Sequence, residues 1–297
     1  MNIADSQRFN SRRPLRLQPI QPKQAAASRP WGKWSLRAVS ILWLVLLIML
    51  PISTLIEHGL RGGLVVFRNE LSSPIALGAL KLTLITAAIM TAINAVMGTL
   101  TAYVLVRYRF TGSRLLNSLI DLPFAIPTLV TGVMLVVLYG PQQLLGAWLE
   151  ARGIQIIFAR PGIVLALLFI TYPFVIRTVQ PVLLAIDRSQ EEAAWTLGAS
   201  PWQTFTRIIL PLLTPAILTG SLLGFARALG EFGSLVVVAG NIPGRTLTAP
   251  VYIYGQIESE NQRGASAMSL LLLTMSFGLM LLVDWLQERR GGISVDE

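Results

Sequence analysis

The sequence predicts an all-α integral membrane protein with six transmembrane helices and one polar helical hairpin between the fourth and the fifth. Three observations predict this fold class. Of the 297 residues, 53% are hydrophobic and only 13% are charged, and the mean hydropathy of +0.62 lies outside the balance of a soluble domain. Six apolar segments are each long enough, at about 20 residues, to cross the roughly 30 Å hydrocarbon layer. The basic residues are distributed unevenly between the two sides that these segments define.

The predicted spans divide the chain into three parts. Residues 1–35 are basic, proline-punctuated and poor in large apolar residues, so we expect a disordered cytoplasmic tail there. An organellar transit peptide is the alternative interpretation of this Arg-rich start. Residues 36–290 form the transmembrane domain, and residues 291–297 form a C-terminal tail. The six spans are predicted at residues 38–56, 75–105, 117–139, 161–186, 213–239 and 266–286.

The positive-inside rule orients these spans. With the N-terminus in the cytoplasm, 15 of the 24 Lys and Arg residues lie on the cytoplasmic side, 6 lie outside and 3 lie within spans. Because the number of spans is even, both termini and the hairpin are expected in the cytoplasm. The net charge of +9 then reflects topology and attraction to anionic membrane lipid, and no nucleic-acid partner is predicted.

The sequence also excludes several kinds of site. It has no cysteine and a single histidine, His58, so disulfides and thiolate sites are excluded and no metal site is predicted. It has no G-x-x-x-x-G-K-[ST] stretch, so any ATP must be bound by another chain. We therefore expect neither a cofactor nor a catalytic residue.

Proline and glycine interrupt several of the predicted spans. In a membrane helix such residues bend the axis or allow close helix packing, and neighbouring groups satisfy the freed backbone atoms. For Pro123 and Pro127 in the third span, two interpretations remain: packing alone, or a transport path that must bend.

The hairpin is predicted over residues 188–211. Ser189 and Glu192 have the spacing of a capping box, which predicts the start of a short helix. Gly198 can adopt the left-handed conformation that ends a helix. The run SPWQ at residues 200–203 predicts a second start, with serine as the cap, proline at the first helical position and glutamine as the box partner. The hairpin either anchors in lipid headgroups through its aromatic residues or docks in a groove of a soluble partner.

A pattern in this hairpin resembles the EAA loop of ABC importer permeases. In that family the loop forms the coupling helices, which seat in a cleft of the ATP-hydrolysing subunit. The resemblance implies that Glu192 is the ionic contact, Gly198 the turn and the alanines the small faces that let the groove approach. The alternative is that Glu192 serves only to cap its own helix. The pattern E-A-A, three residues, G, nine residues, I-x-L-P consists here of Glu192, Ala193, Ala194, Gly198, Ile208, Leu210 and Pro211.

The resemblance extends over about residues 75–290. Segments 107–132, 172–183 and 226–246 are similar to permeases for tetrahedral oxyanions, in particular the T-type subunit of sulfate and thiosulfate importers. Residues 153–175 also resemble the sister W-type subunit, and the GNIPG run at residues 240–244 is shared with molybdate permeases. Molybdate or tungstate is therefore the alternative cargo.

The resemblance implies the type I ABC importer permease fold and a set of partners. We expect a heterodimer with a sister permease subunit, two ATP-binding subunits and a periplasmic sulfate-binding protein, located in a bacterial inner membrane. The plastid envelope is the minor alternative. A secondary anion transporter and a membrane-anchored scaffold are the competing classes; the first would need its own coupling-ion site, often with internal repeats, and neither is clear in this sequence.

Charges within the spans are candidates for the transport path because each is costly at mid-bilayer. Arg227 and Glu231 lie four residues apart, so they either neutralise each other or leave Arg227 to face the anion while Glu231 tunes the packing of a gate. Arg177 and Lys81 are expected to extend towards the interface, or Arg177 to bind the second subunit. Asp121 has no predicted partner. Conduction requires release as well as entry, so the remaining candidates are small: Thr128, Thr131, Gly233 and Ser234.

Overall fold

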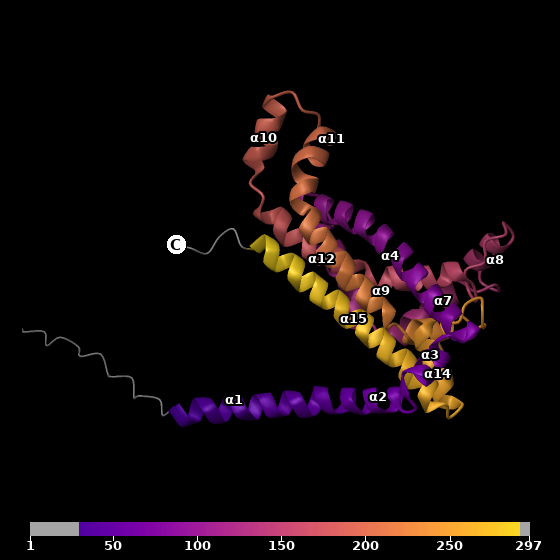
Figure 1. The fold of residues 1–297 in the computed structure, drawn as a ribbon. Coiled ribbons are helices and arrows are strands. Elements are labelled where there is room, and N and C mark those ends of the chain that lie inside the picture. Colours follow the sequence, from indigo (N-terminus) through magenta and orange to yellow (C-terminus); the bar gives the residue numbers. More distant parts are fainter. Residues whose placement is uncertain (1–29, 292–297) are drawn as a thin grey trace, which may run out of the picture. The chain divides into compact units, whose positions relative to one another are not determined.

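A computed structural model describes residues 30–291, with side chains for residues 34–285, and every regular element in this range is helical (Figure 1). The predicted all-α class is confirmed. The chain divides into two compact units, residues 1–51 and residues 52–297. The first contains α1 (Pro30–Leu44), the π-helical turn η1 (Val45–Met49) and the start of α2 (Leu50–Leu60). Apart from residues 30–35, which begin α1, the predicted N-terminal tail lies outside the described residues, as do residues 292–297 of the C-terminal one.

The second unit holds fourteen further elements within the described residues. They are α3 (Gly63–Leu71), α4 (Pro74–Arg107), α5 (Ser113–Ile120), α6 (Leu122–Ala125), α7 (Thr128–Tyr139), α8 (Leu144–Glu150), α9 (Arg160–Ala185), α10 (Arg188–Thr196), α11 (Pro201–Thr204), the π-helical turn η2 (Phe205–Ile209), α12 (Leu210–Leu229), α13 (Gly233–Val238), α14 (Ala249–Glu258) and α15 (Gln262–Gly291).

Five segments of the described chain are long and apolar enough to span a bilayer: Trp34–Leu60, Pro74–Arg107, Arg160–Ala185, Pro201–Leu229 and Gln262–Trp285. The third predicted span, residues 117–139, is not one straight helix. It consists of Ser113–Ala125 and Thr128–Tyr139, which meet at an angle of 112°. The break has a local cause, because the residue before a proline avoids helical angles, and Ile126 before Pro127 is extended. Of the two prolines, Pro127 makes the bend and Pro123 lies in the first turn of α6.

The fifth predicted span, residues 213–239, has different ends. At its C-terminal side α12 stops at Leu229, and after a break α13 starts afresh at Gly233. At its N-terminal side the helix begins already at Pro201 and runs on through Pro211 and Pro215. The π-helical turn η2 ends two residues before Pro211, as η1 ends two residues before Pro51. A proline has no N–H for the carbonyl four residues earlier, and a wider turn at that point absorbs the gap in the hydrogen-bond ladder.

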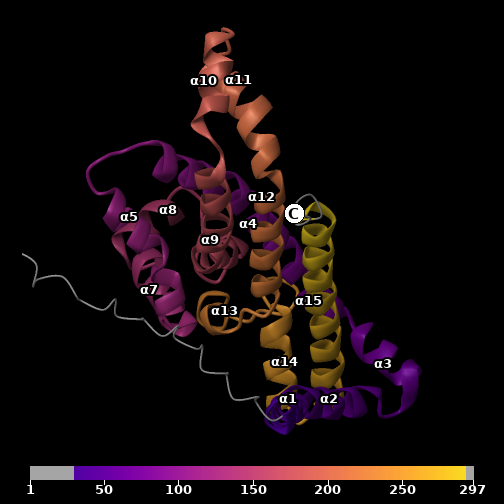
Figure 2. The ribbon, with the colours of Figure 1, turned by 90° about the vertical axis from the view of Figure 1, so that its left-hand side faces the viewer.

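The core of the second unit lies where α4, α9 and α12 pack together, with α15 along α12 (Figure 2). Small residues permit the close approach: a Cβ on Gly220 would lie 2.8 Å from the Cα of Val175. One buried polar bridge joins α4 to α9, in which Asn94 Nδ2 donates to Thr171 Oγ1 at 2.9 Å. Helices α10 and α11 project together from one end of this bundle, the end where α15 also finishes, while α3 and α14 lie at the opposite end (Figure 1).

The contact at Gly220 generates the first prediction. We expect Gly220→Ala to lower the stability of the purified protein by about 1–3 kcal/mol, because the added methyl group must displace the backbone of α9. Gly278→Ala in α15 is the matched control, since its methyl group would meet nothing within 4 Å. Thermal unfolding in detergent measures both variants, and equal melting temperatures would contradict the packing described for α9 and α12.

Candidate functional site

The first helix of the hairpin is capped by a residue other than the one predicted. Helix α10 begins at Arg188, and Asp187 is its N-cap, with a carboxylate oxygen that accepts the backbone N–H of Ser189 at 2.9 Å. The predicted box of Ser189 and Glu192 is therefore wrong. The bond from the backbone of Ser189, followed by its side chain, lowers the pKa of Asp187 below the ordinary value. These hydrogen bonds favour the ionised carboxylate, which is why its pKa is lowered. The cap is therefore present at neutral pH and is lost as the pH falls through that pKa.

The turn and the second helix follow the prediction. Gly198 has a φ of +85° and stands directly after the C-cap Leu197. The backbone N–H of Ala199 then reaches the carbonyl of Ala194 at 3.0 Å. Ser200 and Gln203 form the predicted capping box at the start of α11, with bonds of 3.3 and 2.8 Å. Residues 188–204 thus fold as a helix, a glycine turn and a second helix. Both helices are capped at their N-termini by nearby residues, the first by Asp187 and the second by Ser200.

The outward-facing side of the hairpin is exposed and carries one carboxylate that has no partner in the described part of the chain. Glu192 is exposed, and no hydrogen bond or ion pair to it occurs within the described residues. Trp195, Leu197 and Trp202 are 50%, 88% and 70% exposed, which is unusual for large apolar side chains. Among the other residues of the predicted pattern, Ala193 and Pro211 are exposed, Ile208 and Leu210 are half-buried and Ala194 is buried. Ile209, which the pattern skips, is fully buried.

The base of the hairpin is held by an ion pair that the sequence did not suggest. Glu191 Oε1 lies 2.7 Å from Nη2 of Arg107, the last residue of α4, and the two side chains are only 6% and 8% exposed. The same Nη2 donates to the carbonyl of Ile186 at 3.4 Å, where α9 ends. Adjacent glutamates therefore have opposite environments, because Glu191 faces the bundle and Glu192 faces outward.

Aromatic rings join α4 to the second arm of the hairpin. Tyr103 packs edge-on against Phe205 of η2 with 5.1 Å between ring centroids, and Phe205 stacks on Trp202 at 6.0 Å. Such ring pairs contribute about 0.5–1.5 kcal/mol beyond the area they bury. The last two turns of α4 thus contact both arms, by charge at Glu191 and by ring packing at Phe205.

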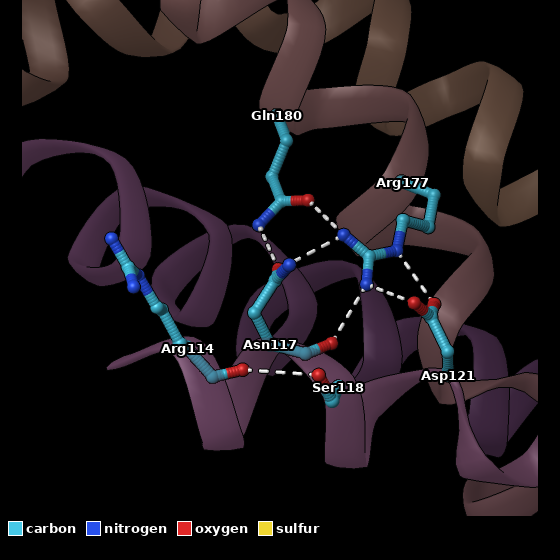
Figure 3. Close-up of polar contacts among 6 residues, drawn as sticks. All are labelled: Arg114, Asn117, Ser118, Asp121, Arg177 and Gln180. Carbon is cyan, nitrogen blue, oxygen red and sulfur yellow. Dashed lines mark hydrogen bonds and ion pairs between the residues drawn. The ribbon is translucent and has the colours of Figure 1, made fainter. Parts of the chain in front are cut away.

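A second polar cluster surrounds Arg177 on α9 (Figure 3). Its Nε donates to Asp121 Oδ1 at 2.7 Å and its Nη2 to Oδ2 at 2.5 Å. Nη1 donates to Asn117 Oδ1 at 2.9 Å and to Gln180 Oε1 at 2.6 Å, and Nη2 donates to the Asn117 carbonyl at 2.8 Å. A guanidinium has five N–H groups, and all five are used here. The sequence suggested neither the partner of Arg177 nor that of Asp121.

This cluster fastens the bent segment to α9. The carbonyl of Asn117 is one of the last four of α5, which have no partner inside their own helix, and Arg177 supplies that partner. Asp121 lies at the junction of α5 and α6, so its ion pair fixes the arm that precedes the bend to α9. Arg177 is therefore occupied by protein acceptors and has no N–H left for a passing anion.

Arg227 has a different environment. Its Nη1 lies 2.9 Å from Glu231 Oε2, which confirms the predicted pair, although Glu231 lies beyond the end of α12 rather than on it. The other oxygen of Glu231 accepts both the backbone N–H and the hydroxyl of Ser234 at 3.0 Å, so the carboxylate also supports the start of α13. Glu231 is 1% exposed, whereas the side chain of Arg227 is 38% exposed and makes no further hydrogen bond within the described residues.

Small residues bring α13 against α7 beside this pair. A Cβ on Gly233 would lie 2.3 Å from Thr128 Oγ1, and one on Gly132 would lie 2.8 Å from the carbonyl oxygen of Ser234. Thr131 is buried, and its hydroxyl has no partner among the described atoms. The structure thus brings together Thr128, Thr131, Gly233 and Ser234, next to the break that Arg227 and Glu231 span.

Comparison with known proteins identifies relatives of the whole arrangement. The family described as binding-protein-dependent transport system inner membrane component matches residues 94–291. The probable sulfate transport system permease protein cysT of Nephroselmis olivacea is 44% identical over 84% of this chain and 88% of its own length. The sulfate transport system permease protein CysT of Synechocystis sp. is 43% identical over 88% of this chain and 89% of its own.

Solved structures show the same fold at low sequence identity. A bacterial alginate ABC transporter in complex with an alginate-bound periplasmic protein has a chain that superposes with a TM-score of 0.73 at 18% identity, over 90% of this chain and 97% of that chain. A chain of the MetNI methionine ABC transporter, in an inward-facing conformation, gives a TM-score of 0.55 at 17% identity, over 71% and 94%.

The ion pair at the base of the hairpin generates the second prediction. Arg107→Met leaves the buried carboxylate of Glu191 without its cation, so we expect a loss of about 3–5 kcal/mol of stability. The double variant Arg107→Met/Glu191→Leu removes both charges and is expected to recover most of that loss. Thermal unfolding measures both, with Arg109→Met on the neighbouring exposed arginine as the control. A double variant no more stable than Arg107→Met would show that the two residues act separately.

Proposed function

Because this chain belongs to the family of binding-protein-dependent transport system inner membrane components, we propose that it is the membrane-spanning permease subunit of an ATP-driven importer and that its cargo is sulfate. The observation that carries the mechanism is the exposed, self-capped hairpin whose free carboxylate, Glu192, points away from the bundle. ATP hydrolysis belongs to separate subunits, since the 297 residues contain no P-loop sequence.

The partners follow from this assignment. We propose a heterodimer with a sister permease, two ATP-binding subunits at the hairpin end and a periplasmic sulfate-binding protein at the other end. The hairpin and the end of α15 lie at the same end of the bundle, which supports a cytoplasmic C-terminus (Figure 2). The relative from Synechocystis supports a bacterial inner membrane, and relatives from plastid-bearing organisms keep the plastid envelope as the alternative.

Glu192 is proposed as the ionic contact to the ATP-binding subunit. Ala193 beside it is exposed and small, and Trp195 and Trp202 offer the apolar surface that typifies the centre of a protein interface. The rigid turn at Gly198 keeps the two short helices in a fixed relation, so a movement of the partner's cleft displaces the hairpin as one body. The pair of Glu191 with Arg107 and the ring contact of Phe205 with Tyr103 then pass this displacement to α4. The helical segment that continues through η2 passes it to α12.

Arg227 is proposed as the cation that meets the transported dianion. Four of its five N–H groups have no acceptor in the described part of the chain, in contrast to the fully occupied Arg177. Glu231 offsets the positive charge of Arg227, which suits a path that must release its cargo as well as admit it. The close contact between Gly233 and Thr128 makes α13 and α7 the proposed gate.

The coupling role of Glu192 generates the third prediction. In the assembled importer we expect Glu192→Gln to reduce sulfate uptake by about 10-fold or more, because charged contacts at interfaces contribute about 2–5 kcal/mol. The folded permease is expected to keep its stability, since Glu192 has no partner within it. Gln190→Ala, on the neighbouring exposed residue of α10, is the control. Unchanged uptake by Glu192→Gln would refute the ionic role.

The role of Arg227 generates the fourth prediction. Arg227→Gln should impair uptake either because the anion loses its cation or because Glu231 is left buried without one. The double variant Arg227→Gln/Glu231→Gln separates the two causes, since it removes the unpaired charge. We expect the double variant to remain impaired, with a raised KM for sulfate, and Arg227→Lys to retain more uptake than either. Recovery in the double variant would show that the pair is only self-neutralising.

The cargo is tested in the same assay by competition. Labelled sulfate uptake that thiosulfate blocks and modest molybdate does not would support a sulfate and thiosulfate importer. Uptake of molybdate in place of sulfate would move the assignment to the molybdate and tungstate class and leave the importer architecture in place. ATP-independent uptake would instead indicate a secondary transporter.

A further inference from the structure

A cavity of about 610 Å³ lies at the end of the bundle opposite the hairpin and has no part in the proposed transport mechanism. Its walls are one face of α4 between Gly78 and Ile89, the first turn of α9 from Arg160 to Val164, and the loop around Arg245 that leads from α13 to α14. Cavities of roughly 300–1,000 Å³ are the size that holds organic ligands. A tetrahedral oxyanion alone, with five heavy atoms, would fill only a small part of this one.

The polar part of the cavity lining is strongly basic. Lys81, Arg160 and Arg245 all line it, and its lining contains no aspartate or glutamate. Within the described residues no carboxylate lies within ion-pair distance of any of these three. Arg160 Nε donates to the carbonyl of Arg245 at 3.3 Å, which joins the loop to α9 and brings two of the charges together. Three uncompensated cations on one cavity favour an anionic occupant.

The rest of the cavity is apolar and follows the surface of a membrane helix. Leu82, Ile85 and Ile89 line it on α4, and Val164 lines it on α9. Ile85 and Ile89 are 46% and 45% exposed, so this wall opens sideways into the layer that the span Pro74–Arg107 crosses. From Lys81 to Ile89 the helix rises by about 12 Å, the depth of several methylene groups.

We propose that this cavity binds one anionic phospholipid. The phosphate group lies among Lys81, Arg160 and Arg245, and an acyl chain lies along Leu82, Ile85 and Ile89. A free oxyanion would leave the apolar wall unused, and an acidic protein surface would not reach along it. The lipid would hold the loop at Arg245 against α9, and Leu247 in that loop packs on the core that also contains Leu229 and Leu235.

The proposal does not depend on the nature of the cargo, and lipid retention tests it directly. The importer is first purified with its partners in detergent that contains a mixture of phosphatidylglycerol and phosphatidylcholine. It is then exchanged into zwitterionic detergent, and native mass spectrometry counts the phospholipid molecules that remain bound. We expect Lys81→Gln/Arg160→Gln/Arg245→Gln to retain about 100-fold less phosphatidylglycerol, since each of the three basic side chains near an anionic headgroup contributes about five-fold.

Matched variants separate this site from general attraction to lipid. Arg61→Gln/Arg68→Gln/Arg263→Gln removes three charges from the turn after α2, from α3 and from α15, all outside the cavity, and should retain phosphatidylglycerol. Ile85→Gln/Ile89→Gln keeps the cations but makes the acyl wall polar, and it should lose the lipid as well. Co-purification of the ATP-binding subunit shows that each variant still assembles.

Three results would overturn the proposal. Equal retention by both charge variants would show that the bound lipid lies elsewhere. Full retention in Ile85→Gln/Ile89→Gln would show that no acyl chain occupies the groove. The third result is displacement of the lipid by millimolar sulfate in every protein except the Lys81, Arg160 and Arg245 variant. That result would mean that the three cations bind a free oxyanion instead.

Discussion

The apolar surroundings of this chain offer its backbone no hydrogen-bond partners, and every interruption of a helix must therefore be satisfied by the chain itself. The side chains that matter most lie at such interruptions. Glu231 accepts the N–H of Ser234 in the first turn of α13, after the break at Leu229, and Arg177 donates to a carbonyl that α5 leaves open before the 112° bend. The residues that stabilise the breaks are thus also those that determine where the bundle can bend.

This constraint divides the charged residues into two groups. Arg107 with Glu191, and Arg177 with Asp121, are committed to protein partners and hold elements in place. Glu192 has no partner in the described chain, and Arg227 is paired through one nitrogen only. Removing one partner of a buried ion pair lowers stability, because the other charge is then left buried without a counter-charge. An incompletely paired and accessible charge, by contrast, is free to bind a ligand or another protein. The adjacent glutamates at the hairpin illustrate both situations on one turn of one helix.

Most of the fold was predictable because it depends on local rules. Hydropathy and length located the spans, and spacing alone indicated the Ser200 box, the turn at Gly198 and the pair Arg227 with Glu231. The contacts between distant segments were not predictable. Arg107 lies 84 residues before Glu191 and Asp121 lies 56 before Arg177, and nothing local marks either partner. The cap at Asp187 was missed for another reason, because two acceptors two residues apart competed for one helix start and the carboxylate prevailed.

The continuous helical segment from Pro201 to Leu229, which passes through η2, has a mechanical consequence. Its 29 residues measure about 44 Å along the axis, with the exposed Trp202 near one end and Arg227 near the other. This rod acts as a lever: a tilt of about 5° at the hairpin displaces the far end by about 4 Å at this length, comparable to the diameter of a small oxyanion. In the proposed importer, a modest rearrangement of the ATP-binding subunit is therefore enough to move Arg227 by about the width of the proposed anion, as long as the helix moves as one body.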